Sequence, residues 1–163
     1  MATNLVYSVG TWIVHVYYGV GQVVRLEKKH LEGKENLYYR VESRNGTFWL
    51  PVNKADSDRI RPIVSKSKMR SAIQALEEPP ERLVGNHMQR KTQIKEIQST
   101  GSIVPIARLV RDLSFQASEK KLSIPEQETL DSLKKRLAME WSVVFDIKPQ
   151  EAQKQLNALL EKH

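Results

Sequence analysis

The sequence predicts an α+β fold, in which a small N-terminal β-barrel is followed by a compact, all-helical C-terminal domain. Apolar and polar residues alternate across residues 9–24 on either side of two close glycines, Gly19 and Gly21, which is typical of a bent pair of strands. Further β-branched and aromatic runs continue to about residue 62. Beyond Arg61 and Pro62, apolar residues recur at intervals of three and four, which is the helical period. We therefore place the domain boundary near residues 62–66.

The expected strands are four runs rich in β-branched and aromatic residues, at positions 13–14, 21–26, 37–41 and 47–52. Turn-forming stretches at 30–34 and 43–46 separate them. Asn45-Gly46 is the strongest hairpin signal, because a type I′ turn requires positive φ at both central residues. Gly19 and Gly21 mark a bend or bulge where a side chain would crowd the next strand. Short strands joined by short turns favour a small curled barrel.

Helices are expected throughout the second half of the chain. The first spans about residues 65–76 and ends before Pro79 and Pro80, since proline lacks the amide hydrogen that a helix needs. A second runs from about 86 to 99 and ends at Thr100-Gly101. Ser102 is suited to cap a third, with Pro105 tolerated in its first turn.

The clearest helix start is Ser123, because Glu126 three residues later completes a capping-box pattern. The residues that follow repeat at three and four: Leu130, Leu133, Leu137, Trp141 and Val144. We interpret this stripe as packing core rather than as a cofactor site. A last helix is expected after Lys148-Pro149.

Composition limits the class of protein. The 163 residues are 40% hydrophobic and 28% charged, which is ordinary for a globular protein. No apolar run approaches the ~20 residues that span a bilayer, and the first residues lack the pattern of a secretory signal. The absence of cysteine excludes disulfides and cysteine-ligated zinc. We therefore expect a cytoplasmic protein without a membrane segment.

Basic charge is concentrated in the first 95 residues. The formal net charge of the chain is +7, of which residues 1–64 carry +3, residues 65–95 carry +4 and the remainder is neutral. This distribution indicates a surface that faces a polyanion. A solubilising excess of charge accounts for it equally well.

Catalytic patterns are missing from the sequence. The four histidines, at positions 15, 30, 87 and 163, are scattered, and no two have the spacing of metal ligands. Gly19-Val20-Gly21 lacks the following helix and third glycine of a nucleotide-binding fingerprint. We therefore expect a protein that is not an enzyme, with no catalytic residue, no cofactor and no metal.

Several segments, taken in order, resemble one known family. They are Val9-Gly10, residues 17–24, Gly33, Leu50-Pro51-Val52, residues 106–113, and Lys121-Leu122-Ser123 with the helix after it. Together they resemble the CarD/CdnL family of bacterial transcription factors, over about residues 5–160. No single segment is specific to the family, but a barrel opening joined to this helical block is a more specific combination.

The resemblance implies a Tudor-like module at residues 1–64 that docks on the β subunit of RNA polymerase. It also implies that the helical module, residues 65–163, contacts promoter DNA in the minor groove and on phosphates at the upstream edge of the melted region. Members of the family generally stabilise the open promoter complex. The same barrel resembles the polymerase-binding module of transcription-repair coupling factors, but no helicase motor follows it here. We expect the protein to act as a monomer.

For polymerase docking, the resemblance points to Lys29, Tyr39, Trp49 and Pro51. Lys29 matches a position that is often basic in the family, and Trp49 occupies one that is basic in some members and apolar in others. A tryptophan just before Leu50 and Pro51 suits an interface, where this residue type is enriched. The alternative is that Trp49 packs on the core of its own barrel.

For DNA, the resemblance points to the start of the second helix, with His87, Met88, Arg90, Lys91 and Lys95. His87 stands where the family carries a tryptophan that wedges into the minor groove, and an imidazole should wedge more weakly. Met88 is a second candidate for insertion, and the basic residues are spaced as phosphate contacts. The alternatives are that His87 is simply an exposed polar residue and that the basic residues form a solvated face.

Two functions therefore remain in comparison. The first is a non-catalytic regulator that binds the polymerase β subunit and stabilises the open complex because it makes more contacts to the open than to the closed state. The second is a protein-interaction module whose barrel binds another partner and whose helical domain has no role at DNA.

Overall fold

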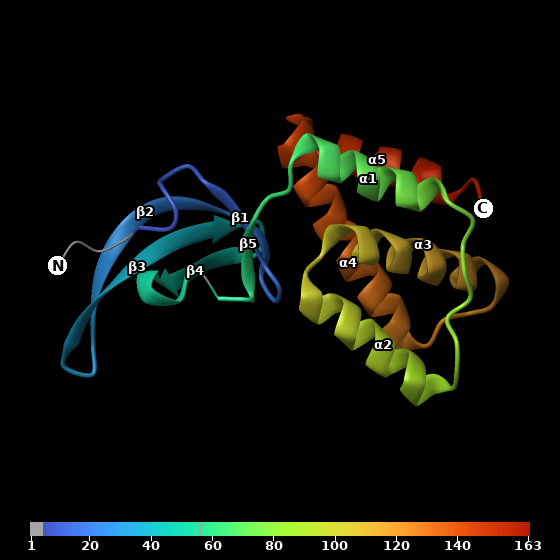
Figure 1. Ribbon diagram of the computed structural model, residues 1–163, viewed down its shortest axis with the longest axis horizontal. Coiled ribbons are helices and arrows are strands. Elements are labelled where there is room, and N and C mark those ends of the chain that lie inside the picture. The colour runs from blue at the N-terminus through green and yellow to red at the C-terminus, as the bar shows by residue number, and fades with distance from the viewer. Residues whose placement is uncertain (1–4, 56) are drawn as a thin grey trace. The chain divides into compact units, whose positions relative to one another are not determined.

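The computed structural model describes residues 5–55 and 57–163, and these divide into two compact units, one up to Ile63 and one from Val64 to His163 (Figure 1). The first unit holds one antiparallel sheet and the second holds five α-helices. The α+β class that the sequence predicts is confirmed.

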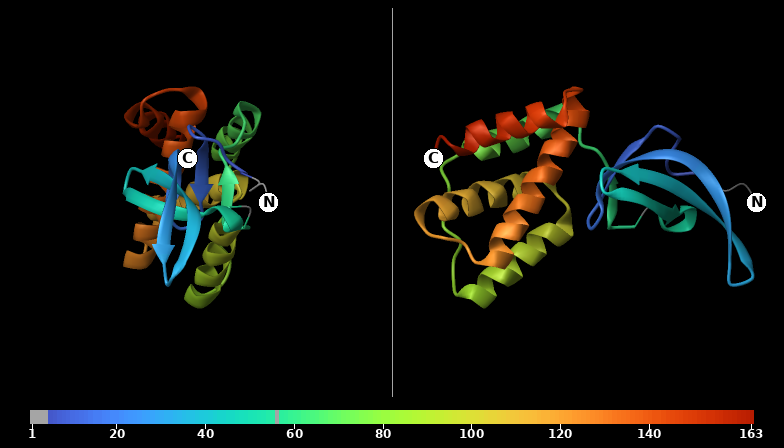
Figure 2. Two further views of the ribbon diagram at one scale, coloured as in Figure 1. Left: turned by 90° about the vertical axis from the view of Figure 1, so that its left-hand side faces the viewer. Right: turned by 180° about the vertical axis from the view of Figure 1, so that it is seen from behind.

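The sheet of the first unit has five strands in the order β4-β3-β2-β1-β5. The strands are β1 (Trp12–His15), β2 (Gly19–Leu31), β3 (Lys34–Ser43), β4 (Gly46–Pro51) and β5 (Ile60–Pro62), with a 3-10 turn, η1 (Val52–Lys54), after β4. The sheet is curled, and β2 and β3 extend beyond it as a long hairpin (Figures 1 and 2). The sheet does not close into the small curled barrel that the sequence predicts, because β4 and β5 are its two free edges.

The turns differ from the sequence prediction. The two-residue loop with positive φ at both positions is Glu32–Gly33, between β2 and β3, which suits the type I′ geometry. In the β3–β4 hairpin, Ser43 pairs with Gly46, so Arg44 and Asn45 form the loop and neither has positive φ. The hydroxyl of Ser43 donates to the Gly46 carbonyl at 2.9 Å, and this local bond stabilises the alternative turn.

Gly21 allows β2 and β3 to approach closely, as the sequence indicated. A Cβ at Gly21 would lie 2.6 Å from Cγ1 of Val41 on β3. The β-bulge lies elsewhere, at the register shift between Val23 and Arg25. The core beneath the sheet is apolar and includes Tyr7, Ile13, Val23, Tyr39, Val41, Leu50 and Ile60. One polar contact within it is the bond from the Tyr7 amide to the Tyr39 hydroxyl, at 3.0 Å.

The second unit consists of α1 (Lys66–Glu77), α2 (His87–Thr100), α3 (Ile103–Glu119), α4 (Ile124–Phe145) and α5 (Pro149–Leu160). These five helices confirm the helical pattern of the sequence. α1 packs against α3, α4 and α5, whereas α2 packs chiefly on α3 (Figure 2). The α4 stripe predicted as core is buried throughout: Leu130, Leu133, Leu137, Trp141 and Val144.

Helix capping corrects two sequence expectations. The capping box lies at α2, where Asn86 and Gln89 exchange side-chain to backbone bonds at 2.9 and 3.0 Å. Ser123 accepts from the Glu126 amide at 3.3 Å, but the Glu126 carboxylate accepts from the Ser123 hydroxyl rather than from its backbone. Ser102 makes no side-chain cap.

A buried charge pair joins the end of α1 to α3. The Arg111 guanidinium, 3% exposed, donates to Asp112 Oδ1 at 2.8 Å and to the Ala75 carbonyl at 3.2 Å. Asp112 also accepts from the Glu81 amide at 2.9 Å. The pair therefore fixes both the last turn of α1 and the chain that leaves it.

We predict that Arg111→Leu destabilises the helical unit by about 3–5 kcal/mol, because the Asp112 carboxylate is left buried without its cation. Urea unfolding followed by the helical circular dichroism signal measures this loss. Arg108→Leu is the control, since Arg108 is half-exposed and pairs with Glu78 at 3.6 Å, so about 0–1 kcal/mol is expected. Equal losses in the two variants would contradict the prediction.

Candidate functional site

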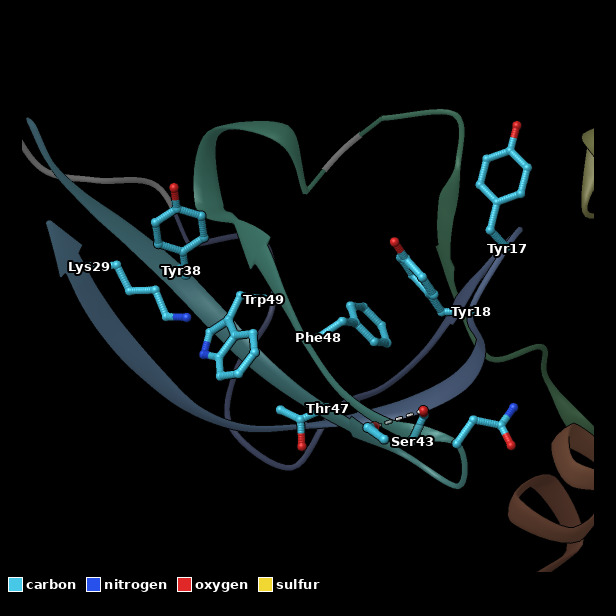
Figure 3. A pocket seen from close by; sticks show the side chains of 10 residues that line it. Tyr17, Tyr18, Lys29, Tyr38, Ser43, Thr47, Phe48 and Trp49 are labelled. Atoms are coloured by element: carbon cyan, nitrogen blue, oxygen red, sulfur yellow. Dashed lines mark hydrogen bonds between the residues drawn. The ribbon is translucent and has the colours of Figure 1, made fainter. Parts of the chain in front are cut away.

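The edge strand β4 borders a pocket of about 600 Å³ in the first unit (Figure 3). Its walls come from β4, from the ends of β2 and β3 and from the turn between β1 and β2, and include Tyr17, Tyr18, Lys29, Tyr38, Phe48 and Trp49. Because side chains alternate along a strand, Phe48 and Trp49 leave β4 on opposite faces. The pocket therefore follows the strand edge from one face of the sheet to the other.

Trp49 lies on the outer face of β4, directly opposite Arg40 of β3. Its side chain is 40% exposed, so it is not the core residue that the sequence left as an alternative. The indole N–H donates to Glu27 Oε2 at 2.8 Å. The Lys29 ammonium lies 3.3 Å from the centroid of the ring, which is cation–π geometry.

Glu27 also accepts from two guanidinium groups through its other oxygen. Arg25 Nε donates to Oε1 at 2.6 Å and Arg40 NH1 does so at 3.3 Å. The hydrogen bond from Trp49, followed by that from Arg25, holds the pKa of this carboxyl below its ordinary value of 4.5. At neutral pH the carboxylate is therefore ionised and shared between the indole and two arginines.

The structure separates the four residues expected to dock a partner. Lys29 and Trp49 lie together at the pocket, and Pro51, half-buried, ends β4 opposite Tyr38. Tyr39, by contrast, is 0% exposed and belongs to the core. Its place follows from strand alternation, because neighbours Tyr38 and Arg40 take the outer face. We therefore assign Tyr39 to packing rather than to docking.

An aromatic cluster at the other end of the pocket is absent from the sequence prediction. Tyr18 stacks on Phe48, with ring centroids 4.9 Å apart, and lies 4.5 Å from the His15 ring. Tyr17 and Tyr18 are both exposed. In the sequence, the two adjacent tyrosines before Gly19 could have indicated this cluster. The curl of the sheet, which the sequence does not show, brings Phe48 next to them.

In the second unit, the predicted residues divide into two rows along α2. His87, Arg90 and Ile94 are spaced i, i+3 and i+7, and burial increases along this row until Ile94 is buried. Met88, Lys91 and Lys95 have the same spacing on an exposed row, and Met88 is 79% exposed. Residues at this spacing share one helix face. The exposed row therefore combines one apolar and two cationic side chains.

Glu126 at the start of α4 engages the inner row. Its carboxylate, 10% exposed, lies 3.5 Å from Arg90 Nε and 3.6 Å from His87 Nδ1. Arg90 also lies 2.9 Å from His87 Nδ1. Because a guanidinium only donates, Nδ1 is the acceptor in that bond. Arg90 is consequently paired within the unit. Of the three basic residues predicted to contact DNA, Lys91 and Lys95 remain exposed.

Other kinds of site are absent from the part of the chain that the structure describes. No three His, Cys, Asp or Glu side chains lie close enough to hold a metal ion there. Within the same residues, no helix has both the length and the apolar character needed to cross a membrane.

Comparison with known proteins matches both units. A family model described as CarD-like/TRCF RID domain matches residues 7–64, and one described as CarD, C-terminal domain matches residues 71–157. A relative from Bacillus subtilis (strain 168), named "Putative transcription factor YdeB", is 28% identical over 144 residues. The match covers 86% of this chain and 94% of the relative.

The lowered pKa of Glu27 predicts how Trp49 responds to pH. Ionised Glu27 favours the folded state above its ordinary pKa of 4.5, and this contribution is lost as the pH falls through the lower pKa of the folded protein. The indole N–H resonance of Trp49, assigned with Trp49→Phe, should therefore titrate with a midpoint below pH 4.5. The same resonance should stay constant in Glu27→Gln over the range in which the protein remains folded. A midpoint at or above 4.5 would contradict the assignment.

Proposed function

Because the chain belongs to the CarD family of transcription factors, we propose that it regulates transcription by binding the β subunit of RNA polymerase and stabilising the open promoter complex. The observation that carries this proposal is the order of the two matches, with an RID domain over the sheet unit and a CarD C-terminal domain over the helical unit. The family is one of transcription factors rather than enzymes. We infer that the protein acts in the cytoplasm as a monomer without a cofactor.

The sheet unit supports a docking role through the edge of β4. An extended segment of the β subunit would pair with this edge through backbone hydrogen bonds, while side chains beside the edge select the partner. Trp49 is the proposed anchor, since it is large and partly exposed, and Lys29 and Pro51 flank it. Tyr38, on the outer face opposite Pro51, takes the place that the sequence assigned to Tyr39.

The helical unit supports contact with DNA through the exposed row of α2. Lys91 and Lys95 would contact phosphates, which position the protein without reading sequence. Met88 is the proposed apolar contact at the upstream edge of the bubble, where an inserted side chain offsets the unstacking of a base step. His87 is held by Arg90, which donates to its Nδ1, so its proposed role is to support the start of the helix beside the DNA.

The proposed mechanism is a shift in equilibrium. A protein with more contacts to the open than to the closed promoter complex stabilises the open state by the difference. Attachment to polymerase through the sheet unit raises the local concentration of the helical unit at the promoter. The α2 row therefore functions with weak intrinsic affinity for duplex DNA.

We predict that Trp49→Ala weakens binding of the full chain to polymerase holoenzyme at least tenfold, since a buried aromatic anchor contributes about 2 kcal/mol or more to an interface. Biolayer interferometry with immobilised holoenzyme measures the change. Glu35→Ala, an exposed position of β3, is the control and should bind as wild type. If the wild-type chain does not bind polymerase holoenzyme, the result would instead support the alternative function, a protein-interaction module that binds another partner.

We predict that Lys91→Gln and Lys95→Gln each lower the salt dependence of open-complex stabilisation, by about 0.9 in the slope of log affinity against log salt concentration. Arg90→Gln should change this slope less, because Glu126 already pairs with Arg90.

His87→Trp should lengthen the open-complex lifetime by adding a stacking surface, and Met88→Ala should shorten it. Lys148→Gln, at the start of α5, is the control. Unchanged lifetimes in all variants would remove the DNA role of this row.

A further inference from the structure

We propose that Glu27 is a positioning residue for docking, which acts by holding the Trp49 indole in the orientation that the partner meets. This inference rests on the proposed function, because it concerns how the polymerase contact is prepared. Its physical basis is the set of contacts that converge on one carboxylate. Oε2 accepts from the indole N–H at 2.8 Å, and Oε1 accepts from Arg25 and Arg40.

The strand register explains how these groups meet on the outer face. Arg25, Arg40 and Trp49 lie directly opposite one another across β2, β3 and β4. Glu27 lies two residues along β2 from Arg25 and therefore on the same face. From there its carboxylate accepts hydrogen bonds from Arg25, from Arg40 and from the Trp49 indole. The arginines in turn restrict where the carboxylate can lie.

Stability accounts for only part of this arrangement, through the pair of Glu27 with Arg40, which is 29% exposed. Arg25 is 60% exposed, and exposed ion pairs contribute little because solvent screens them. Orientation accounts for the rest. Trp49 stands on an edge strand with no further strand beside it in the sheet, so core packing alone does not select one side-chain rotamer. The hydrogen bond to Glu27 and the Lys29 ammonium against the ring select one.

The contacts also limit what a partner can offer. The indole N–H is already satisfied by Glu27, and Lys29 covers one face of the ring. The remaining surface is apolar, so the partner would meet it with an apolar or aromatic side chain and needs no hydrogen-bond acceptor there. Holding the ring before binding removes the entropy cost of ordering it in the complex.

The expected effect is therefore a moderate loss of affinity when Glu27 is removed. We expect Glu27→Leu to weaken binding to polymerase holoenzyme about 3- to 10-fold, the range for ordering one side chain. Glu27→Gln should retain most of the affinity, because its amide oxygen can still accept from the indole. The matched control is Glu42→Leu, which removes the same charge from the outer face of β3. Glu42 is half-exposed and pairs with Arg40 at 3.8 Å.

A double-mutant cycle tests whether Glu27 acts through the indole. Trp49→Phe keeps an aromatic ring but has no N–H, so Glu27→Leu should cost less than twofold in that background. The Trp49 indole N–H resonance of the free protein gives a readout independent of polymerase. It should shift and broaden in Glu27→Leu but not in Glu42→Leu.

Three outcomes would overturn the proposal. The first is an unchanged indole resonance in Glu27→Leu, and the second is an equal loss of affinity in Glu42→Leu, which would indicate general charge. The third is an undiminished effect of Glu27→Leu in the Trp49→Phe background. Any of these leaves wild-type binding to polymerase intact. Failure of the wild-type chain to bind would overturn the proposed function itself, and the docking role of Glu27 with it.

Discussion

The open edge of the sheet at β4 is the constraint on which the functional surface of the first unit depends. An edge strand presents backbone groups that can pair with another chain, which natural proteins manage with charged side chains, bulges and curvature. This sheet uses two of these devices near β4: a curled form and a cluster of charges on the neighbouring strands. The surface is thus guarded against indiscriminate pairing while Trp49 stays partly exposed. An edge of this kind suits selective docking better than a closed barrel would.

In each unit, a carboxylate pairs with nearby basic side chains. In the sheet unit, the Glu27 carboxylate accepts hydrogen bonds from Arg25 and Arg40 and from the indole of the partly exposed Trp49. In the helical unit, Glu126 pairs with Arg90, while Lys91 and Lys95 on the outer row of α2 stay exposed. In each case a carboxylate withdraws some of the positive charge. The number of basic residues in a segment therefore overstates the number that a partner can reach.

The helical unit shows how a departure from the family is accommodated. His87 stands where the resemblance implies a tryptophan, and its ring is 66% exposed and bonded to Arg90. The start of α2 is nonetheless well defined, since Asn86 and Gln89 form a complete capping box. Gly85 permits that box, because a Cβ there would lie 2.2 Å from Gln89 Oε1. Met88 is 79% exposed beside this helix start, so an apolar side chain is available at this end of the unit.

The sequence by itself determined the α+β class, the helices of the second unit and most strands, because hydrophobic period and turn residues are local properties. It also identified Lys29, Trp49 and the start of α2 as candidates. Tertiary structure alone decided that the sheet stays open, since β5 is a three-residue strand whose pairing with β1 has no local signal. It likewise placed Tyr39 in the core and brought Glu27 to Trp49 and Glu126 to Arg90. The residues of these two pairs are 22 and 36 positions apart in the chain. Strand register and helix packing determine such contacts, and neither can be predicted from the composition of a short segment.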